Sequence, residues 1–166
     1  HLKKTVFSTY LINTVILTIG TGLLSTLIGV FCAWVIACCE FPLKKFFEWA
    51  LILPLAIPTY VSAYAYFDIL ELSNPILIWV RENINLEAMQ SLNSFFVYFF
   101  TILVLSSVLY PYVYLLTRAS FLKQGNQLIE ASLSLGHNMN EIFWKIALPM
   151  ARPAVFAGLS LVIMET

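Results

Sequence analysis

The sequence predicts an all-α, polytopic bundle of transmembrane helices, and three observations favour this fold class. Hydrophobic residues make up 60% of the 166 residues and charged residues only 11%, whereas an ordinary soluble domain is roughly 25% charged. Two stretches, residues 5–39 and 88–117, carry no charged side chain over more than the about 20 residues that a helix needs to cross a bilayer. Small residues also recur at helical spacing, which permits the close helix packing found in membrane bundles.

The first membrane span is expected within residues 10–39, because no charged residue occurs from Thr5 to Cys39. Small side chains recur along it every three or four positions, so a neighbouring backbone can approach one face closely. We therefore expect this helix to lie inside the bundle. All three cysteines lie in or at the end of this stretch without metal-ligand spacing, and we interpret them as packing residues. The small residues are Thr14, Thr18, Gly22, Ser25, Gly29 and Ala33.

A second span is expected at residues 49–67, which are uncharged but contain Pro54 and Pro58. Proline removes a backbone donor and interrupts the helical ladder. Such breaks occur at membrane depth mainly where protein or a water-filled cavity surrounds them, although a simple proline kink is an equal alternative. A polar, acidic connection follows at residues 68–91 and is interpreted as a surface-lying segment.

The third span is expected at residues 92–116, since no charge occurs from Ala88 to Thr117. A fourth apolar stretch, residues 153–166, is too short to cross and reads as a truncated helix. The chain begins without Met, at His1. We therefore expect it to be a fragment of a longer membrane subunit.

Orientation follows from the distribution of Lys and Arg, which are enriched in cytoplasmic connections. The favoured orientation places residues 118–152 in the cytoplasm and residues 68–91 outside the cell membrane. It leaves only Lys3, Lys4 and Arg81 on the outer side. The positive residues that it places inside are Lys44, Lys45, Arg118, Lys123, Lys145 and Arg152.

Polar residues return in a segment between the third and fourth stretches, which we name the elbow (residues 126–149). Gly136 is typical of a helix end. Asn138 followed by Glu141 resembles a capping box, so a second helix is expected to begin there. The two expected pieces, 127–135 and 141–147, are each shorter than the about 12–15 residues that give an isolated helix marginal stability, so packing must order them.

Three fixed features of the elbow resemble the signature of ABC importer permeases, their cytoplasmic EAA loop. These are Glu130-Ala131-Ser132, then Gly136, then Ile146-Ala147-Leu148-Pro149. The family usually has a second Ala at the position of Ser132. The resemblance implies that the elbow is a coupling loop that docks onto a cytoplasmic ATPase, the alternative being an ordinary amphipathic loop helix. The implied docking residues are Glu130, Ala131, Ser132, Leu133, Leu135, Gly136, Ile146, Leu148 and Pro149.

The resemblance also implies the setting of the chain. Residues 1–166 would form part of one type I importer permease domain, a multi-pass domain of the inner (plasma) membrane. Its implied partners are a homodimer of separate ATPase subunits that bind the ATP, an extracytoplasmic substrate-binding protein, the lipid bilayer, and a second permease half in the same polypeptide.

The segment Leu53–Tyr66 resembles the second-helix region of ferric iron permeases, whose relatives include thiamine permeases. Tyr60 and Tyr64 are one helical turn apart, and phenol oxygens suit a hard cation such as Fe³⁺. The alternative is that both are interfacial aromatics. Ferric iron is the favoured cargo, with thiamine, polyamine and sulfate left open. The candidate pathway residues are Pro58, Tyr60, Ser62, Tyr64 and Glu165.

Several function classes lack their residues in this sequence. A formal net charge of zero gives no reason to expect nucleic acid. No glycine-rich phosphate loop and only two histidines occur, so we expect no catalytic residue, resident metal or cofactor in this chain. The competing readings are an ATP-independent secondary transporter or channel, a membrane enzyme, and a purely structural anchor.

Overall fold

The computed structural model describes residues 2–58, 60, 61, 64 and 86–166. Ser62, residues 68–85 of the expected outer connection (residues 68–91) and the later part of the second span lie outside the described residues. The elements are α1 (Leu2–Cys38), α2 (Lys44–Ala50), η1 (Leu53–Ala56), α5 (Leu86–Ser134), α6 (Met139–Ile142), η2 (Phe143–Ala147) and α7 (Leu148–Glu165). Within these ranges there is no strand, which confirms the all-α class.

Three of the described helices are long and apolar enough to cross a membrane: Phe7–Cys38, Val97–Gln124 and Met139–Glu165. They overlap the first, third and fourth expected spans. Where the second span is described, no continuous helix crosses it. Pro54 is the second residue of the short 3-10 helix η1, and the backbone at Ile57 is extended. The helix is therefore interrupted where proline was expected to interrupt it.

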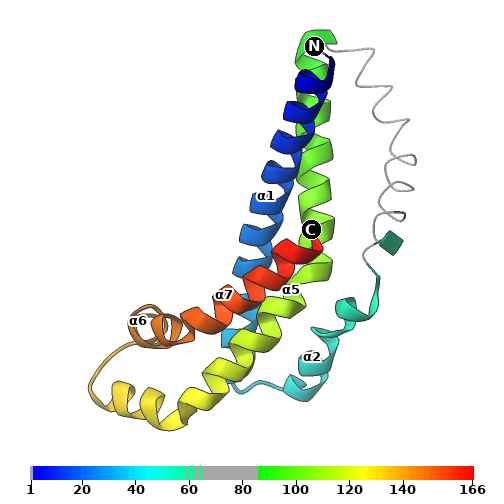
Figure 1. Ribbon diagram of the computed structural model, residues 1–166. Helices are drawn as coiled ribbons and strands as arrows, with labels where there is room; N and C mark the ends of the chain where they lie inside the picture. Colours follow the sequence, from blue (N-terminus) through cyan, green and yellow to red (C-terminus); the bar gives the residue numbers. More distant parts are fainter. Residues whose placement is uncertain (1, 59, 62–63, 65–85) are drawn as a thin grey trace.

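The helices α1 and α5 lie side by side and run in the same direction, while α7 returns beside them in the opposite direction (Figure 1). Two hydrogen bonds fix the register of the parallel pair. The Tyr98 hydroxyl donates to Asn13 Oδ1 at 2.9 Å, and the Ser106 hydroxyl donates to the Thr21 carbonyl at 3.4 Å. Both pairs are 85 residues apart in sequence, so the two helices keep one register over more than two turns.

All three long helices meet at Val113, a place that we name the Val113 crossing (Gly29, Val113 and Gly158). A Cβ added at Gly158 would lie 2.7 Å from Val113 Cα, and one added at Gly29 would lie 2.8 Å from Val113 Cβ. Side chains at either glycine would therefore force the helices apart. Val113 itself is fully buried, and the core extends on either side through Ala33, Ile36, Leu109, Tyr114, Phe121, Ala147, Ala151 and Val162.

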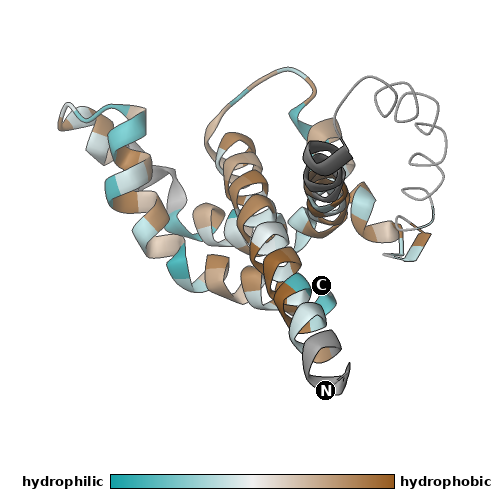
Figure 2. Cartoon of the chain, turned by 90° about the horizontal axis from the view of Figure 1, so that it is seen from above, coloured by the Kyte–Doolittle hydropathy of each residue, from teal (hydrophilic) through white to brown (hydrophobic). Residues whose placement is uncertain are grey.

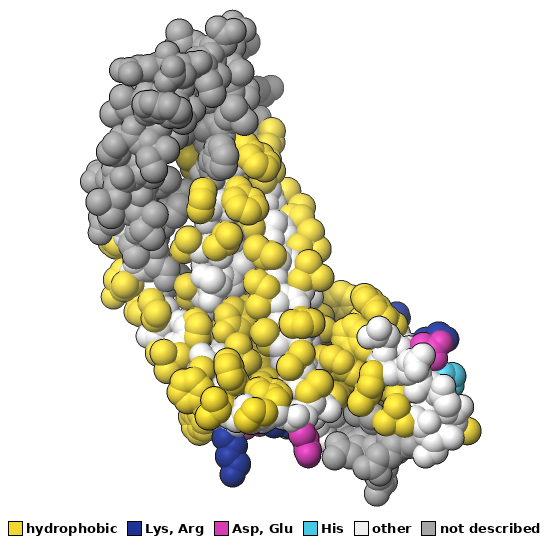
Figure 3. Space-filling view, turned by 180° about the vertical axis from the view of Figure 1, so that it is seen from behind, with side chains coloured by type: hydrophobic (Ala, Val, Ile, Leu, Met, Phe, Trp, Pro, Cys, Tyr) yellow, Lys and Arg dark blue, Asp and Glu magenta, His cyan; other side chains and the backbone are white. Residues whose placement is uncertain are grey.

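Polar side chains gather toward one end of the bundle. Seen from above, the hydrophilic colours concentrate on the end of α5 and the connection to α6 (Figure 2). From behind, the middle of the bundle is almost wholly hydrophobic, and charged side chains show only at its lower margin and on the elbow (Figure 3). At this end Arg118 of α5 pairs with Glu48 of α2 at 3.1 Å. This pair ties the short α2 to the bundle.

The two short helices expected in the elbow are not separate pieces. The first is the end of the 49-residue α5, which runs on to Ser134. The second, α6, continues through η2 into α7 without a break. Polar residues can be exposed to water on a helix without ending it. For this reason α5 continues to Ser134, just before Gly136 ends the helix.

Candidate coupling elbow

The first half of the elbow ends in a Schellman motif. Gly136 has φ +86°, the left-handed conformation that favours glycine. The N–H of Gly136 donates to the Leu133 carbonyl at 2.9 Å, and the N–H of His137 donates to the Ser132 carbonyl at 3.2 Å. These two bonds satisfy carbonyls that the end of α5 would otherwise leave free. The expected helix end at Gly136 is thus confirmed.

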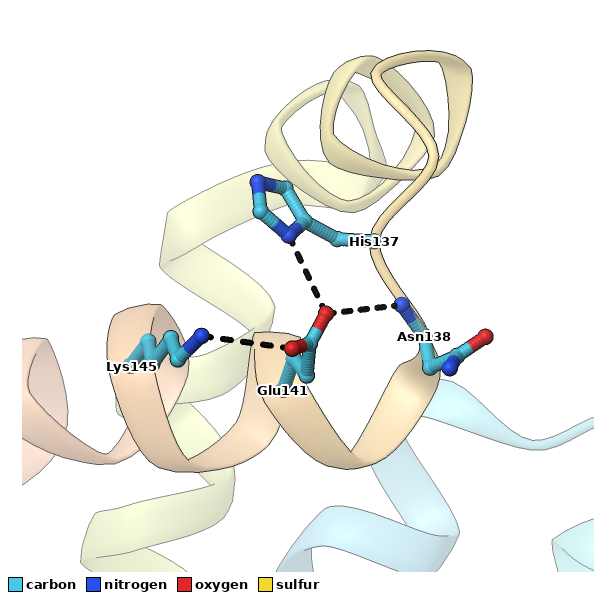
Figure 4. Close-up of polar contacts among 4 residues, drawn as sticks. All are labelled: His137, Asn138, Glu141 and Lys145. Carbon is cyan, nitrogen blue, oxygen red and sulfur yellow. Dashed lines mark hydrogen bonds and ion pairs between the residues drawn. The ribbon is translucent and has the colours of Figure 1, made fainter.

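The second half begins with α6, whose first residue is Met139 and whose N-cap is Asn138. The carboxylate of Glu141 in this helix contacts three neighbours (Figure 4). It accepts the N–H of Asn138 at 3.4 Å and the Lys145 ammonium at 3.2 Å, and it contacts His137 Nδ1 at 3.1 Å. The bond to the Asn138 backbone is the glutamate half of the expected capping box. Hydrogen bonds from His137, Lys145 and the Asn138 backbone, in that order, hold the pKa of Glu141 below its ordinary value. Glu141 lies in α6, ahead of the apolar α7.

Trp34 of α1 packs between α5 and the elbow. Its ring centroid lies 5.5 Å from that of Phe121 in an edge-on arrangement, and 5.0 Å from that of Phe143 in η2. Such aromatic pairs contribute about 0.5–1.5 kcal/mol beyond their buried area. Ala147 is buried in the same cluster, and Ile142 is buried as well. The returning half of the elbow is therefore fixed to both α1 and α5.

A wide helical turn joins the elbow to α7. η2 is a π-helix, in which the N–H of Leu148 donates to the carbonyl of Phe143, five residues back. The next residue, Pro149, has no N–H to donate. From α5, Gln124 Nε2 donates to the Ala147 carbonyl at 3.3 Å. The irregular turn thus has a side-chain partner from a neighbouring helix.

The expected docking residues divide between the surface and the interior. Ala131, Leu133, Leu135 and Gly136 are exposed, and Leu135 is 80% exposed. Ser132 is buried, while Ile146, Leu148 and Pro149 are half-buried. Glu130 lies on α5, and its side chain is outside the described part. Apart from the buried Ser132, the described residues in the first half of the signature therefore lie at the surface, and those in the second half take part in packing.

The expected pathway residues are less gathered. Pro58, Tyr60 and Tyr64 are exposed, and Glu165 is exposed at the end of α7. No hydrogen bond or ion pair between described residues joins Glu165 to either tyrosine. Over the same ranges, no group of three His, Cys, Asp or Glu side chains could hold a metal ion.

Sequence reasoning missed the residues that hold the elbow from inside. Trp34, Gln124 and the Glu48–Arg118 pair all act through contacts between segments far apart in the sequence. One signal was available, since a tryptophan and a charged pair at the end of otherwise apolar spans are typical of the membrane boundary. The role of Gly158 carries no local signal beyond being a small residue in a membrane helix.

Comparison with known proteins places the chain in a family. Residues 25–166 match the family described as the binding-protein-dependent transport system inner membrane component. A ferric iron transport system permease protein of Haemophilus influenzae, FbpB 2, is 28% identical over 153 residues, which cover 92% of this chain and 26% of that protein.

Two sulfate transport relatives are similarly distant. A probable sulfate transport system permease protein of Chlorokybus atmophyticus, cysT, is 27% identical over 90% of this chain and 51% of its own length. A sulfate transport system permease protein of Synechococcus elongatus, CysT, is 28% identical over 80% of this chain and 45% of its own length. The chain spans about half the length of these relatives or less. Because the family match covers most of its residues, this chain belongs to the inner membrane components of binding-protein-dependent transport systems, the permeases of ABC importers.

Proposed function

We propose that this chain is part of the permease subunit of an ATP-driven importer, and that the elbow docks onto separate cytoplasmic ATPase subunits. The observation that carries the proposal is the contrast between the two sides of the elbow. Outside, Leu133, Leu135 and Met139 expose 42%, 80% and 42% of their surface. Inside, Trp34 and Gln124 hold the second half of the elbow to α1 and α5, through Phe143 and Ala147 respectively. An exposed apolar surface on a fixed support suits a partner protein.

The same construction can transmit motion. The elbow continues into α7 through η2 without a break in helical structure. A partner that moves the elbow therefore acts on a membrane helix and not on a loose loop. In this proposal, closure of an ATPase homodimer around ATP would shift the membrane helices between outward- and inward-open arrangements. An extracytoplasmic binding protein would deliver the cargo.

A second permease half in the same polypeptide belongs to the proposal. The matched part of the Haemophilus influenzae relative is 26% of its length, which leaves room in that relative for another unit of similar size. The two permease halves would then enclose one pathway between them. Mass spectrometry of the denatured permease subunit gives the mass of the single polypeptide and would decide this point.

Ferric iron is the proposed cargo, supported by the Haemophilus influenzae relative and by the phenol groups of Tyr60 and Tyr64. Both side chains are exposed, at 64% and 72%, and their oxygens suit a hard cation. Sulfate is the second candidate, because the two other relatives described above are sulfate permeases. Thiamine and polyamines have no such support among those relatives.

Docking is tested with charge reversal and bulk on the outer side of the elbow. Glu130→Lys and Gly136→Trp should each lower ATP-dependent uptake by at least tenfold in the complete importer, while membrane insertion is unchanged. Lys123→Glu, a charge reversal on an exposed residue of α5 ahead of the elbow, is the matched control and should keep most of the uptake. Full uptake in both elbow variants would remove the elbow from the mechanism.

Cargo is tested in membrane vesicles that contain the complete subunit, its ATPase and its binding protein. Radiolabelled ferric iron and radiolabelled sulfate are offered separately, each beside a complex with an inactive ATPase. We expect iron uptake only with the active ATPase, and at least a tenfold lower iron uptake when Tyr60 and Tyr64 are both changed to Phe. Sulfate accumulation without iron accumulation would keep the importer and overturn the cargo. Iron uptake with the inactive ATPase would overturn the importer.

A further inference from the structure

A groove of about 540 Å³ lies between α1 and the returning segment that includes α6, η2 and α7. On the α1 side it is lined by Leu27, Phe31 and Trp34, among others. Leu27 and Phe31 are 68% and 67% exposed. The volume falls within the about 300–1,000 Å³ typical of small-molecule sites. The groove is thus large enough for a ligand, and its α1 wall is apolar and aromatic.

The opposite wall lies along the returning segment. Five of its side chains are spaced by four residues, each about one helical turn from the next: Asn140, Trp144, Leu148, Arg152 and Phe156. Phe143 and Val155 complete this wall. Because α1 and α7 run in opposite directions, Trp34 lies at the same end of the groove as Trp144, and Leu27 at the same end as Phe156. One end is therefore mainly apolar, with Thr26 as its polar residue, and the other combines indole rings with the Asn140 amide.

Arg152 is the only charged residue among the lining side chains. Its side chain is exposed, and among the described residues no carboxylate lies within ion-pair distance of it. An arginine can lay its methylene stem along apolar side chains while its guanidinium reaches toward a polar boundary. It presents up to five N–H donors in a planar fork that matches a phosphate. The wall thus offers an unpaired positive charge beside an apolar channel.

We propose that this groove binds one anionic phospholipid from the leaflet on the elbow side, with an acyl chain along Leu27, Phe31 and Phe156 and the phosphate at Arg152. Indole rings favour the membrane boundary, where Trp34 and Trp144 would flank the headgroup. Basic pockets between membrane helices are known to hold such headgroups. An acidic peptide would also satisfy Arg152, but it would leave the apolar end of the groove without a matching partner.

The lipid preference is tested on the complete subunit, purified in mild detergent and titrated with phosphatidylglycerol or phosphatidylcholine. Native mass spectrometry counts the retained lipid. We expect the wild-type subunit to prefer phosphatidylglycerol about fivefold, the effect of one basic residue at an anionic surface. Arg152→Gln should reduce this preference to near equality, whereas Arg152→Lys should retain most of it. Lys123→Gln, which removes an exposed charge away from the groove, should leave the preference unchanged.

The position of the lipid is tested by fluorescence quenching. The subunit is placed in bilayers that contain phosphatidylglycerol with brominated acyl chains, and Phe156→Trp adds a fluorescent indole at the acyl end of the groove, where Phe156 is 64% exposed. After the wild-type signal is subtracted, we expect stronger quenching of the added indole by the brominated anionic lipid than by brominated phosphatidylcholine. Equal binding of both lipids, an Arg152→Gln variant that matches the wild type, or an added indole that neither lipid quenches would overturn the proposal. The last result would mean that another protein segment covers the groove.

Discussion

Glycine is required both at the Val113 crossing and at the elbow, but for opposite reasons. At the crossing there is no room for a side chain at position 158, since a Cβ on Gly158 would lie 2.7 Å from the Val113 backbone. At Gly136 no atom lies within 4 Å of an added Cβ, yet φ is +86°. The first glycine lets helices touch, and the second lets a helix stop. The comparison separates a residue needed for packing from one needed for backbone conformation, although both look alike in the sequence.

The largest effect is expected at the crossing. Gly158→Ala should lower the melting temperature of the purified subunit strongly, because overpacking costs about 1–3 kcal/mol and the neighbour here is backbone that cannot rotate away. Gly22→Ala is the matched control, since its Cβ would meet only the flexible end of Leu159 at 3.0 Å. Thermal unfolding in detergent compares the two. Equal melting temperatures would mean that the helices can separate at Val113 without cost.

A smaller effect is expected when the elbow glycine is replaced. Gly136→Val should destabilise the end of α5 by about 1–2 kcal/mol, the cost of the left-handed conformation for a residue with a side chain. Gly136→Asn should cost much less, because Asn tolerates that conformation. Amide hydrogen exchange at Gly136 and His137, the two donors of the Schellman motif, reports the change. Similar exchange in both variants would show that the left-handed backbone conformation does not limit this position.

The hydrogen bond from Gln124 of α5 to the Ala147 carbonyl of η2 can be removed without changing either glycine. Gln124→Leu removes the donor to the Ala147 carbonyl, and a hydrogen bond of this kind contributes about 1 kcal/mol. We expect faster hydrogen exchange in η2 and little change at the Val113 crossing. A uniform increase in the hydrogen-exchange rate along α7 would instead mean that the elbow and the membrane part of α7 open as one unit.

The smallest effect is expected at Glu141 and depends on pH. The pKa of Glu141 is lowered in the folded chain. Its contribution to the free energy of unfolding is therefore present in full above the ordinary pKa of about 4.3. That contribution is lost as the pH falls through the lowered pKa. Glu141→Gln should therefore weaken the start of α6 slightly at neutral pH and remove this acid-range dependence. NMR titration of the Glu141 carboxyl in the wild type measures the pKa. The helix content of the wild type and of Glu141→Gln, followed over the same pH range, measures the pH dependence. A wild-type pKa at or above the ordinary value would contradict the expectation.

The features that the sequence predicted correctly are those coded locally. Gly136 and the pair Asn138 and Glu141 were recognisable because a helix stop and a helix start each depend on a few neighbouring residues. The length of α5 could not be predicted from the sequence, because the residues after Thr117 are polar enough to resemble a loop and yet form helix. The roles of Gly158 and Trp34 depend on which helices become neighbours. Such contacts follow from the register of α1, α5 and α7, which no short stretch of sequence contains.

The contact of Gly158 with Val113 gives the returning helical segment the geometry of an unequal lever. At about 1.5 Å per residue, Glu141 lies about 26 Å along the axis from Gly158, whereas Glu165 lies about 10 Å beyond it. If the segment turns about this tight contact, a displacement at the elbow moves the Glu165 end about 2.5-fold less and in the opposite direction. The force at the Glu165 end is larger by the same ratio. A wide, weak movement at the elbow would become a short, strong one deep in the membrane.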